Sequence, residues 1–271
     1  MMKPAAFCLL GFLVVLTGCR SVRPPETARG PHFRLMTYNV NWGGPSPMSA
    51  VEVIRREKPD IICLQETTAD WEKLLRAALS RDYPYMSFRS SKGRAGGGLG
   101  FLSKTRPIET AYIPSDTGWF DGWIMSFSTD AGPVQVLNVH LRPPVSDRGS
   151  FGVSGYLFTD DDRQREIQRF YATGRADVPM IIAGDFNDSE GSGVLRWLKG
   201  KGMQNALPEF DRHTPTWEWQ TSVITLRRRM DHIVYPPELY CYEARVVRAG
   251  ESDHFPVVGV FGRRDEARIT R

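Results

Sequence analysis

The feature that most constrains the fold of this chain is the excess of strand-like segments over helical ones. Short runs of apolar or alternating residues predict strands along most of the sequence, whereas helical spacing of apolar residues appears in only a few places. A doubly wound parallel sheet needs a helix between most of its strands, so this pattern argues against it. We expect instead two packed sheets of mixed strands, with the helices outside them.

The predicted elements follow one another without a linker-like gap. Helices are predicted over residues 47–58, 68–80, 159–171 and 193–199. Strands are predicted over residues 33–40, 60–66, 83–88, 99–104, 108–113, 123–128, 134–141, 179–185, 216–220, 230–235, 240–247 and 256–261. A length of 271 residues is at the upper end for one domain. We expect one domain over residues 32–263 and a C-terminal tail over residues 264–271.

The composition is that of an ordinary soluble globular domain. Hydrophobic residues make up 41% and charged residues 24% of the chain, so disorder is expected only at the ends. The net charge of +4 suits a polyanionic substrate without requiring one.

The first residues are predicted to form a targeting segment outside the fold. Lys3 precedes an apolar stretch, Ala5–Leu16, that is too short to span a bilayer comfortably. The run Leu16-Thr17-Gly18-Cys19 then resembles the lipobox of bacterial lipoproteins, which implies cleavage before Cys19 and a lipid on that residue. The alternative is a plain secretory signal with a chance cysteine.

The lipoprotein resemblance implies an anchored domain in the bacterial cell envelope. Residues 1–18 are then the signal peptide, and residues 19–31, rich in Arg, Pro and Gly, are a tether. Arg20, a residue other than Asp after the lipidated cysteine, favours the outer membrane. The domain keeps Cys63 and Cys241, whose spacing supports neither a disulfide nor a zinc site.

The most informative local motif is Gly184-Asp185-Phe186-Asn187, which follows the apolar stretch Val178–Ala183. Positions i and i+2 of a strand point the same way, so Asp185 and Asn187 are expected to reach the same place beyond the sheet edge. A carboxylate and an amide aimed together suit the binding and attack of a phosphate. The motif is equally compatible with a simple turn, because Asp and Asn favour turns.

Similar polar residues stand at the tips of other predicted strands. They are Asn39, Glu66, His140, Asp231 and the pair Asp253-His254. In this order, the runs resemble the endonuclease/exonuclease/phosphatase superfamily, whose best-known members are like pancreatic deoxyribonuclease. The resemblance covers residues 33–261 and implies an α+β fold, a four-layer α/β/β/α sandwich, with the active site at one edge of the paired sheets.

The resemblance implies a metal-dependent reaction on a phosphoester. A hard divalent cation binds a non-bridging phosphate oxygen and itself needs oxygen ligands. Glu66 is the expected principal ligand, with Asn39 and Asp253 as helpers, directly or through water. Mg²⁺ is the expected ion, because it binds few carboxylates and keeps waters, and Mn²⁺ or Ca²⁺ could substitute.

The other tip residues are expected to act on the substrate and on water. His254 is the expected general base, and the resemblance assigns to Asp231 the role of holding its tautomer. Asn187 would donate a hydrogen bond to the phosphoryl oxygen, and Asp185 would orient the attacking water or its base. His140, if protonated, would donate to the phosphate or to the leaving oxygen.

Basic residues supply further candidates. Family members often carry an arginine at the start of the helix that covers Arg163 and Arg165, so either is a candidate for supporting or binding the substrate, and a solvated charged face is the alternative. Arg227 to Arg229 could help to hold a polyanion, although a solvated strand edge explains them as well.

Three other segments have simpler interpretations. Trp217 and Trp219 alternate on a strand and are expected to pack in the fold. The run Gly93–Gly100 lacks the ending of a phosphate-binding loop and is interpreted as a turn. Arg142–Phe158 is expected to be a long loop beside the site, because it contains two prolines and three glycines.

These features predict a monomeric, lipid-anchored, metal-dependent phosphoesterase that uses direct attack by water. A nuclease is the first hypothesis. The second is a phosphatase or a phospholipase- or sphingomyelinase-type phosphodiesterase that acts on lipid or sugar-phosphate headgroups. A non-catalytic binding protein on the same scaffold is the third, although every expected acid and histidine is present.

Overall fold

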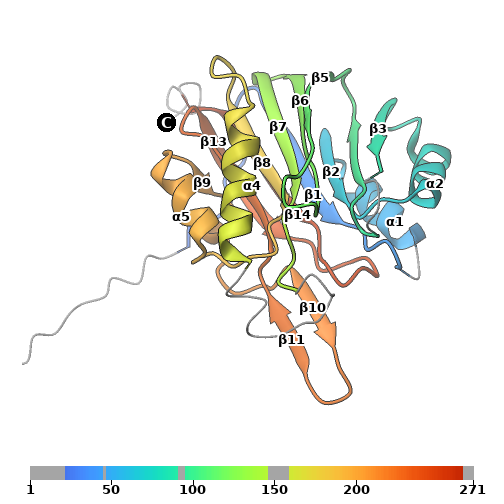
Figure 1. The fold of residues 1–271 in the computed structure, drawn as a ribbon. Coiled ribbons are helices and arrows are strands. Elements are labelled where there is room, and N and C mark those ends of the chain that lie inside the picture. Colours follow the sequence, from blue (N-terminus) through green and yellow to red (C-terminus); the bar gives the residue numbers. More distant parts are fainter. Residues whose placement is uncertain (1–21, 45–46, 91–94, 146–158, 265–271) are drawn as a thin grey trace, which may run out of the picture.

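The computed structural model describes residues 22–44, 47–90, 95–145 and 159–264 (Figure 1). Two six-stranded sheets lie face to face. The first sheet has the order β13 (Leu239–Val246), β14 (Val257–Arg263), β1 (His32–Asn39), β2 (Ile61–Gln65), β4 (Leu99–Ser103), β3 (Tyr85–Arg89). The second has the order β5 (Ile108–Ile113), β6 (Gly122–Thr129), β7 (Gly132–His140), β8 (Met180–Asp185), β12 (Asp231–Tyr235), β9 (Gln204–Asn205).

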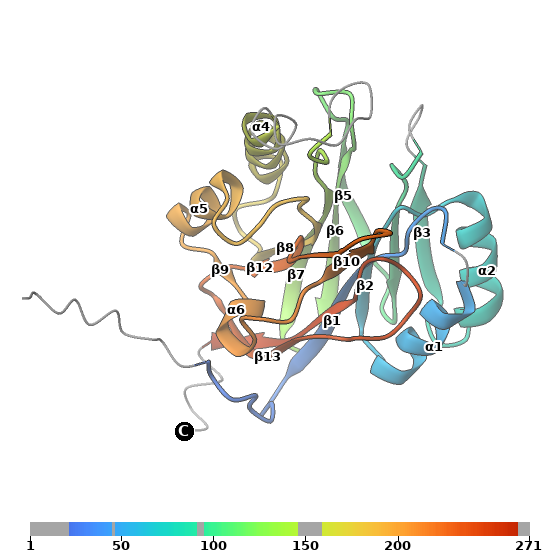
Figure 2. The same ribbon diagram turned by 90° about the horizontal axis from the view of Figure 1, so that it is seen from below.

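Helices cover the outer faces of both sheets (Figure 2). They are α1 (Pro47–Glu57), α2 (Ala69–Leu79), α4 (Asp160–Ala172), α5 (Gly193–Gly200) and α6 (Leu207–Phe210). Helix α2 begins at a Thr68 cap that accepts from the Trp71 N–H, and α5 begins at a Ser192 cap that accepts from the Leu195 N–H. The predicted four-layer α/β/β/α sandwich is confirmed.

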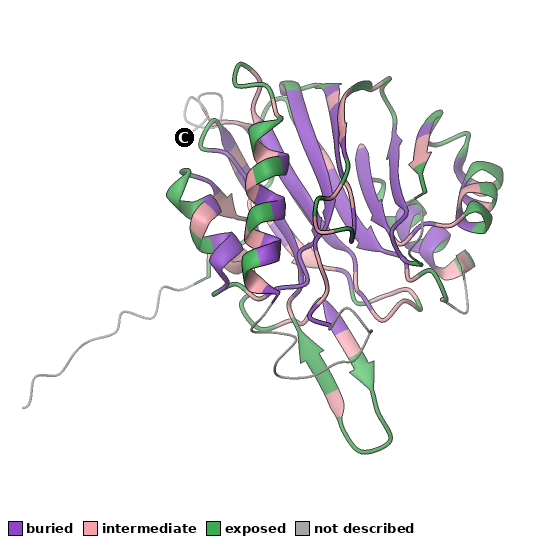
Figure 3. Ribbon diagram, viewed as in Figure 1, coloured by how far each residue is buried: buried purple, intermediate pink, exposed green. Residues whose placement is uncertain are grey.

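The layers follow from strands that are apolar on both faces. Leu35 of β1 enters the core between the sheets, whereas its neighbour Met36 enters the core beneath α1 and α2. Likewise Ile181 of β8 joins the central core, and Ile182 joins the core beneath α4 and α5. Successive strand residues point to opposite faces, so continuous apolar runs fill two cores at once. The buried residues accordingly form a band through both sheets in Figure 3.

Within the described residues, the hairpin of β10 (Trp217–Gln220) and β11 (Thr225–Arg228) lies apart from this body. It forms a separate two-stranded sheet that projects from the body (Figure 1). Sequence periodicity predicted β10 but missed β11, as it missed the short elements β9 and α6.

The N-terminal part of the described chain packs on the domain. The N–H of Arg23 donates to the Glu209 carbonyl at 2.7 Å, and the N–H of Glu26 donates to the Tyr242 carbonyl at 2.9 Å. Residues 22–31, the described part of the expected tether, therefore lie along α6 and β13. The signal peptide, Cys19, most of the 142–158 loop and residues 265–271 lie outside the described residues. No helix among the described residues is long and apolar enough to cross a membrane.

Candidate active site

Strand register brings the predicted tip residues to one edge of the sandwich. β1 and β2 run parallel, with Asn39 beside Gln65, so Glu66 emerges next to Asn39. In the second sheet, β7 and β8 run parallel with His140 beside Asp185. β12 runs antiparallel to β8 and places Asp231 opposite Asp185. The carboxyl ends of four strands and the start of a fifth thus meet.

Unusual backbone angles turn the chain at these tips. Glu66, Asn41 and Asn187 have backbone φ values of 61°, 58° and 50°. These values lie in the left-handed region, which residues other than glycine rarely adopt. Each such residue costs on the order of 1–3 kcal/mol and persists only where its surroundings hold it. Just before the tip of β8, a Cβ on Gly184 would lie 1.9 Å from the Val139 carbonyl oxygen, so only glycine fits there.

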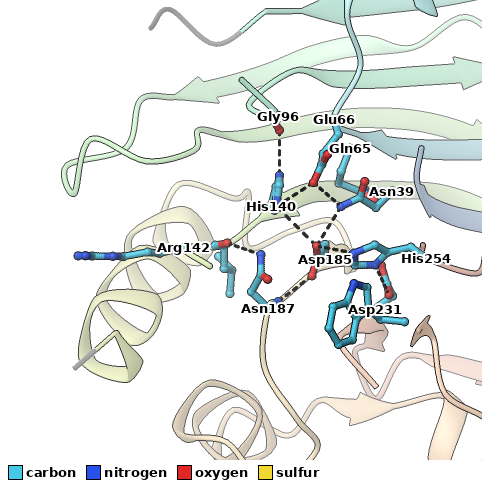
Figure 4. A network of polar contacts seen from close by, with 12 residues as sticks. Asn39, Gln65, Glu66, Gly96, His140, Arg142, Asp185, Asn187, Asp231 and His254 are labelled. Atoms are coloured by element: carbon cyan, nitrogen blue, oxygen red, sulfur yellow. Dashed lines mark hydrogen bonds and ion pairs between the residues drawn. The ribbon is translucent and has the colours of Figure 1, made fainter. Parts of the chain in front are cut away.

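Asn39 joins the two sheets at the centre of the site (Figure 4). Its Nδ2 donates to Glu66 Oε1 and to Asp185 Oδ2, both at 3.0 Å. Its Oδ1 accepts from the Asn41 N–H at 3.0 Å. Asn39 was predicted to assist the metal, but here it presents its N–H groups to the two carboxylates and orients them.

His254 and Asp231 form a closely paired dyad. Nδ1 of His254 lies 2.9 Å from Asp231 Oδ2, and its Nε2 lies 3.6 Å from Asp185 Oδ2. Burial alone lowers the pKa of His254, but the carboxylates of Asp231 and Asp185 outweigh it and raise the pKa to about 10. The dyad therefore favours an imidazolium in the absence of a cation.

His140 lies across the site in very different surroundings. Its Nδ1–H donates to the Gly96 carbonyl at 3.1 Å, and Phe120 stacks on its ring with centroids 4.0 Å apart. Burial lowers its pKa to about 4, although Asp185 opposes this. Nε2 then carries a lone pair toward Asp185 Oδ2 at 3.5 Å and Glu66 Oε1 at 3.9 Å. The neutral ring has no Nε2 proton to donate, as the predicted donor role would require.

Glu66, His140, Asp185 and His254 line a cavity of about 420 Å³. Its lining includes the carboxylates Glu66, Asp185 and Asp253 and both histidines, but among the described residues no lysine or arginine. Asn187 also lines it, held by its Nδ2 donating to the Leu141 carbonyl at 3.0 Å. The cavity thus has an excess of acceptors over positive charge.

The donor set fits a hard divalent cation. Ligand atoms of Asp185, Asp231 and His254 all lie within 4.8 Å of one another. Asp231 Oδ1 is buried, and no hydrogen-bond donor reaches it from the described residues. Burial also raises the pKa of the Glu66 and Asp185 carboxyls, although the charge of His254 opposes this.

This cluster differs in part from the predicted ligand set. Glu66 lies at its edge, whereas both oxygens of Asp253 already accept hydrogen bonds, from Asn41 Nδ2 at 2.8 Å and Trp217 Nε1 at 3.0 Å. Asp185, which was predicted to orient water, is the carboxylate that faces Asn39, His140 and His254 together.

The two candidate arginines lie outside the cavity lining. Arg163 is fully buried, where its Nε donates to Asp188 Oδ2 at 3.0 Å and its Nη1 to Thr159 Oγ1 at 2.7 Å. Arg165 has a side chain 66% exposed and pairs with Asp162. Arg163 thus braces the residue after Asn187 from behind, and neither arginine touches the cavity.

Sequence reasoning missed the aromatic wall of the cavity. Trp42, Trp119, Phe120, Trp217 and Trp219 all line it. Trp217 and Trp219 were predicted only to pack in the fold, but they also line the cavity. Gly96, in the segment interpreted as a turn, supplies the carbonyl that fixes His140.

Comparison with known proteins agrees with this fold and site. A model of the Endonuclease/Exonuclease/phosphatase family matches residues 36–254. The DNA repair nuclease APEX1 of Danio rerio is 25% identical over 233 residues, which cover 81% of this chain and 70% of that protein.

Solved structures show the same fold at low identity. An endonuclease/exonuclease/phosphatase from Beutenbergia cavernae superposes with a TM-score of 0.66 at 18% identity, over 86% of this chain and 72% of that one. D. rerio TDP2 complexed with single strand DNA product gives 0.65 at 15% identity, over 85% and 99%. The human Nocturnin catalytic domain with bound sulfate gives 0.62 at 18%, over 89% and 100%. Together with the match over residues 36–254, the convergent strand tips show that the chain belongs to the endonuclease/exonuclease/phosphatase family.

Proposed function

We propose that this protein is a metal-dependent phosphodiesterase that hydrolyses nucleic acid by direct attack of water. The observation that carries the proposal is the convergence of Glu66, Asp185 and His254, the last paired with Asp231, at a cavity whose described lining has no lysine or arginine. The three carboxylates of the lining would repel a phosphodiester anion, and a divalent cation would offset that repulsion. The resemblance to the nuclease APEX1 supports nucleic acid as the substrate.

Glu66 and Asp185 would hold the cation, for which Mg²⁺ is the first choice and Mn²⁺ or Ca²⁺ the alternatives, and the cation would supply positive charge to a non-bridging phosphate oxygen. Asn39 orients both carboxylates through its two 3.0 Å hydrogen bonds. Asn187, in the cavity lining, offers its amide to the phosphate.

His254 is the general base in this proposal. Its Nε2 lies 3.6 Å from Asp185 Oδ2, and the charge of a cation held by Asp185 would favour loss of the His254 proton. The neutral imidazole accepts a proton from the attacking water as the new P–O bond forms and the ester P–O bond breaks, and the leaving oxygen takes a proton from solvent. Asp231 holds Nδ1–H, so that Nε2 is the nitrogen available to exchange a proton.

The test is hydrolysis of defined nucleic acids by the protein beginning at Val22. Single- and double-stranded DNA and RNA are incubated with Mg²⁺, Mn²⁺ or Ca²⁺, with and without a chelator. We expect cleavage that the chelator abolishes, that is lost in Glu66→Ala and His254→Ala, and that is kept in the exposed control Glu52→Gln. Nucleic acid that stays intact with every metal would reject this substrate.

A hydrolase of lipid phosphodiesters is the second candidate. The observation that favours it is the group of exposed apolar side chains on the β10–β11 hairpin beside the cavity. We also propose the lipid anchor on Cys19 and a location in the bacterial envelope. Metabolic labelling with a radioactive fatty acid, lost in Cys19→Ser, tests the anchor.

A further inference from the structure

The two faces of the β10–β11 hairpin differ in character. Cross-strand register pairs Trp217 with Arg228, Glu218 with Arg227, Trp219 with Leu226 and Gln220 with Thr225. Alternate strand residues share a face, so one face carries two tryptophans, a leucine and an arginine, and the other is polar. Trp217 and Trp219 line the cavity, so the apolar face is the one toward the site.

Apolar side chains are concentrated on this hairpin and its tip. Trp219 is 45% exposed, Val223 86%, Ile224 57% and Leu226 44%. The other large exposed hydrophobics of the described residues are scattered, at Val22, Trp42, Met48, Tyr85 and Ile108. In Figure 3 the hairpin stands clear of the body and is largely exposed. A projecting apolar cluster of this kind marks a binding surface.

The charge along β11 is positive. Arg227 and Arg228 are exposed on β11. The only acidic residue between positions 217 and 228 is Glu218, and it accepts from Arg227 at 3.0 Å and from Arg248 at 3.2 Å. Two arginines thus face the single charge of Glu218, and with Arg228 the hairpin region keeps a net positive charge. This charge complements an anionic surface.

The chemistry of the tip selects between anionic partners. Nucleic-acid bases stack on aromatic rings, but the most exposed residues, Val223 and Ile224, are aliphatic and offer no ring. A bilayer accepts aliphatic side chains in its acyl region, tryptophan at the headgroup level and arginine at anionic headgroups. Pairing with a second copy of the tip would bring the arginines of both copies together.

We propose that the β10–β11 hairpin docks the domain on an anionic lipid bilayer, with Val223 and Ile224 inserted and Arg227 and Arg228 among the headgroups. Because Trp217 and Trp219 line the cavity, docking brings its mouth close to the membrane surface.

The experiment is vesicle flotation of the protein beginning at Val22, which retains both sheets and all three large cores. Vesicles contain phosphatidylcholine alone or with phosphatidylglycerol. We expect binding to the anionic vesicles, weakened at least about tenfold in Val223→Ser/Ile224→Ser because two aliphatic side chains no longer leave water. Arg227→Gln/Arg228→Gln is expected to weaken binding at low salt and to flatten its salt dependence.

The matched control is Ile108→Ser, which removes an aliphatic side chain that is 73% exposed on β5. It is expected to bind vesicles as the wild type does. Circular dichroism and hydrolysis of a small soluble phosphodiester should be unchanged in the tip variant, which separates docking from folding and from catalysis. Wild-type protein that ignores anionic vesicles, or a tip variant that binds them equally well, overturns the proposal. So does a tip variant that loses binding to single-stranded DNA while wild-type protein leaves vesicles unbound.

Discussion

The two sides of the cavity hold two equally buried histidines in opposite protonation states. On one side, Asp231 and Asp185 raise the pKa of His254 to about 10. On the other, the Gly96 carbonyl and the Phe120 ring surround His140, whose pKa falls to about 4 because burial dominates. The difference teaches that partners, more than burial, decide which histidine carries a proton at neutral pH.

The largest effect on activity is expected from removing the Asp231 carboxylate, which pairs with His254. Asp231→Asn deletes the charge that fixes Nδ1–H and stabilises the imidazolium. We expect kcat to fall about 10³- to 10⁴-fold. The measurement is steady-state hydrolysis at pH 7, with Asp130→Asn in an exposed turn as the matched control. Activity within tenfold of wild type contradicts the dyad.

On the His140 side, the buried Arg163 donates hydrogen bonds to Asp188 Oδ2 and to the Arg142 carbonyl, which follows the strand that carries His140. Arg163→Ala leaves Asp188 buried without its guanidinium, and we expect the free energy of unfolding to fall by about 3–5 kcal/mol. Arg165→Ala is the control, with an expected loss below about 1 kcal/mol because the Arg165 side chain is exposed and Asp162 keeps its ion pair with Arg142. Urea unfolding of both variants makes the measurement. Equal losses of unfolding free energy in the two variants would show that the buried contacts of Arg163 do not stabilise the fold.

A substitution of Glu66 that removes its charge tests its proposed role as a metal ligand. Glu66→Gln keeps a group that can accept from Asn39 but removes the charge. We expect the metal concentration for half-maximal activity to rise at least about tenfold, and calorimetric affinity for the ion to fall in parallel. Glu52→Gln, exposed on α1, serves as control. An unchanged metal requirement argues that Glu66 holds no cation.

The smallest expected effects are in pH dependence. The raised pKa of His254 contributes stability that is present below about pH 6.5 and is lost as pH rises toward 10. The lowered pKa of His140 acts in the other direction, because the unfolded chain gains a proton below about pH 6.5, so stability falls toward pH 4.

NMR titration of the two imidazoles in metal-free protein measures both shifts. We expect His254 to stay protonated at pH 8 and His140 to stay neutral at pH 5.5. Added Mg²⁺ is expected to lower the pKa of His254, because like charges repel. Two rings that titrate together near pH 6.5 would remove the distinction between the sides.

Most of the architecture could be predicted because strand and helix periodicity is local. The polar tips follow apolar runs, so Asn39, Glu66, His140 and Asp185 were found from sequence. The aromatic wall was not, since Trp119 and Phe120 come from a connection whose place depends on the packing of two sheets. The elements β9, α6 and β11 were missed because each is too short to show a clear hydrophobic period.

The face of α4 was also hard to assign, because charged residues occupy its buried stripe. Arg163, Glu166, Ile167 and Phe170 are all buried. They recur at helical spacing, so Ile167 and Phe170 already pointed to Arg163 as an inward residue. A periodicity that counts only apolar residues overlooks such a buried ion pair.

The bridge made by Asn39 has a consequence for when hydrolysis can begin. Its single amide nitrogen grips one carboxylate from each sheet, so the reactive arrangement exists only after the two sheets have closed on each other. A chain whose two sheets have not yet packed together has every reactive residue and no working centre. The order of assembly alone thus keeps the site inactive until the protein has reached its finished form.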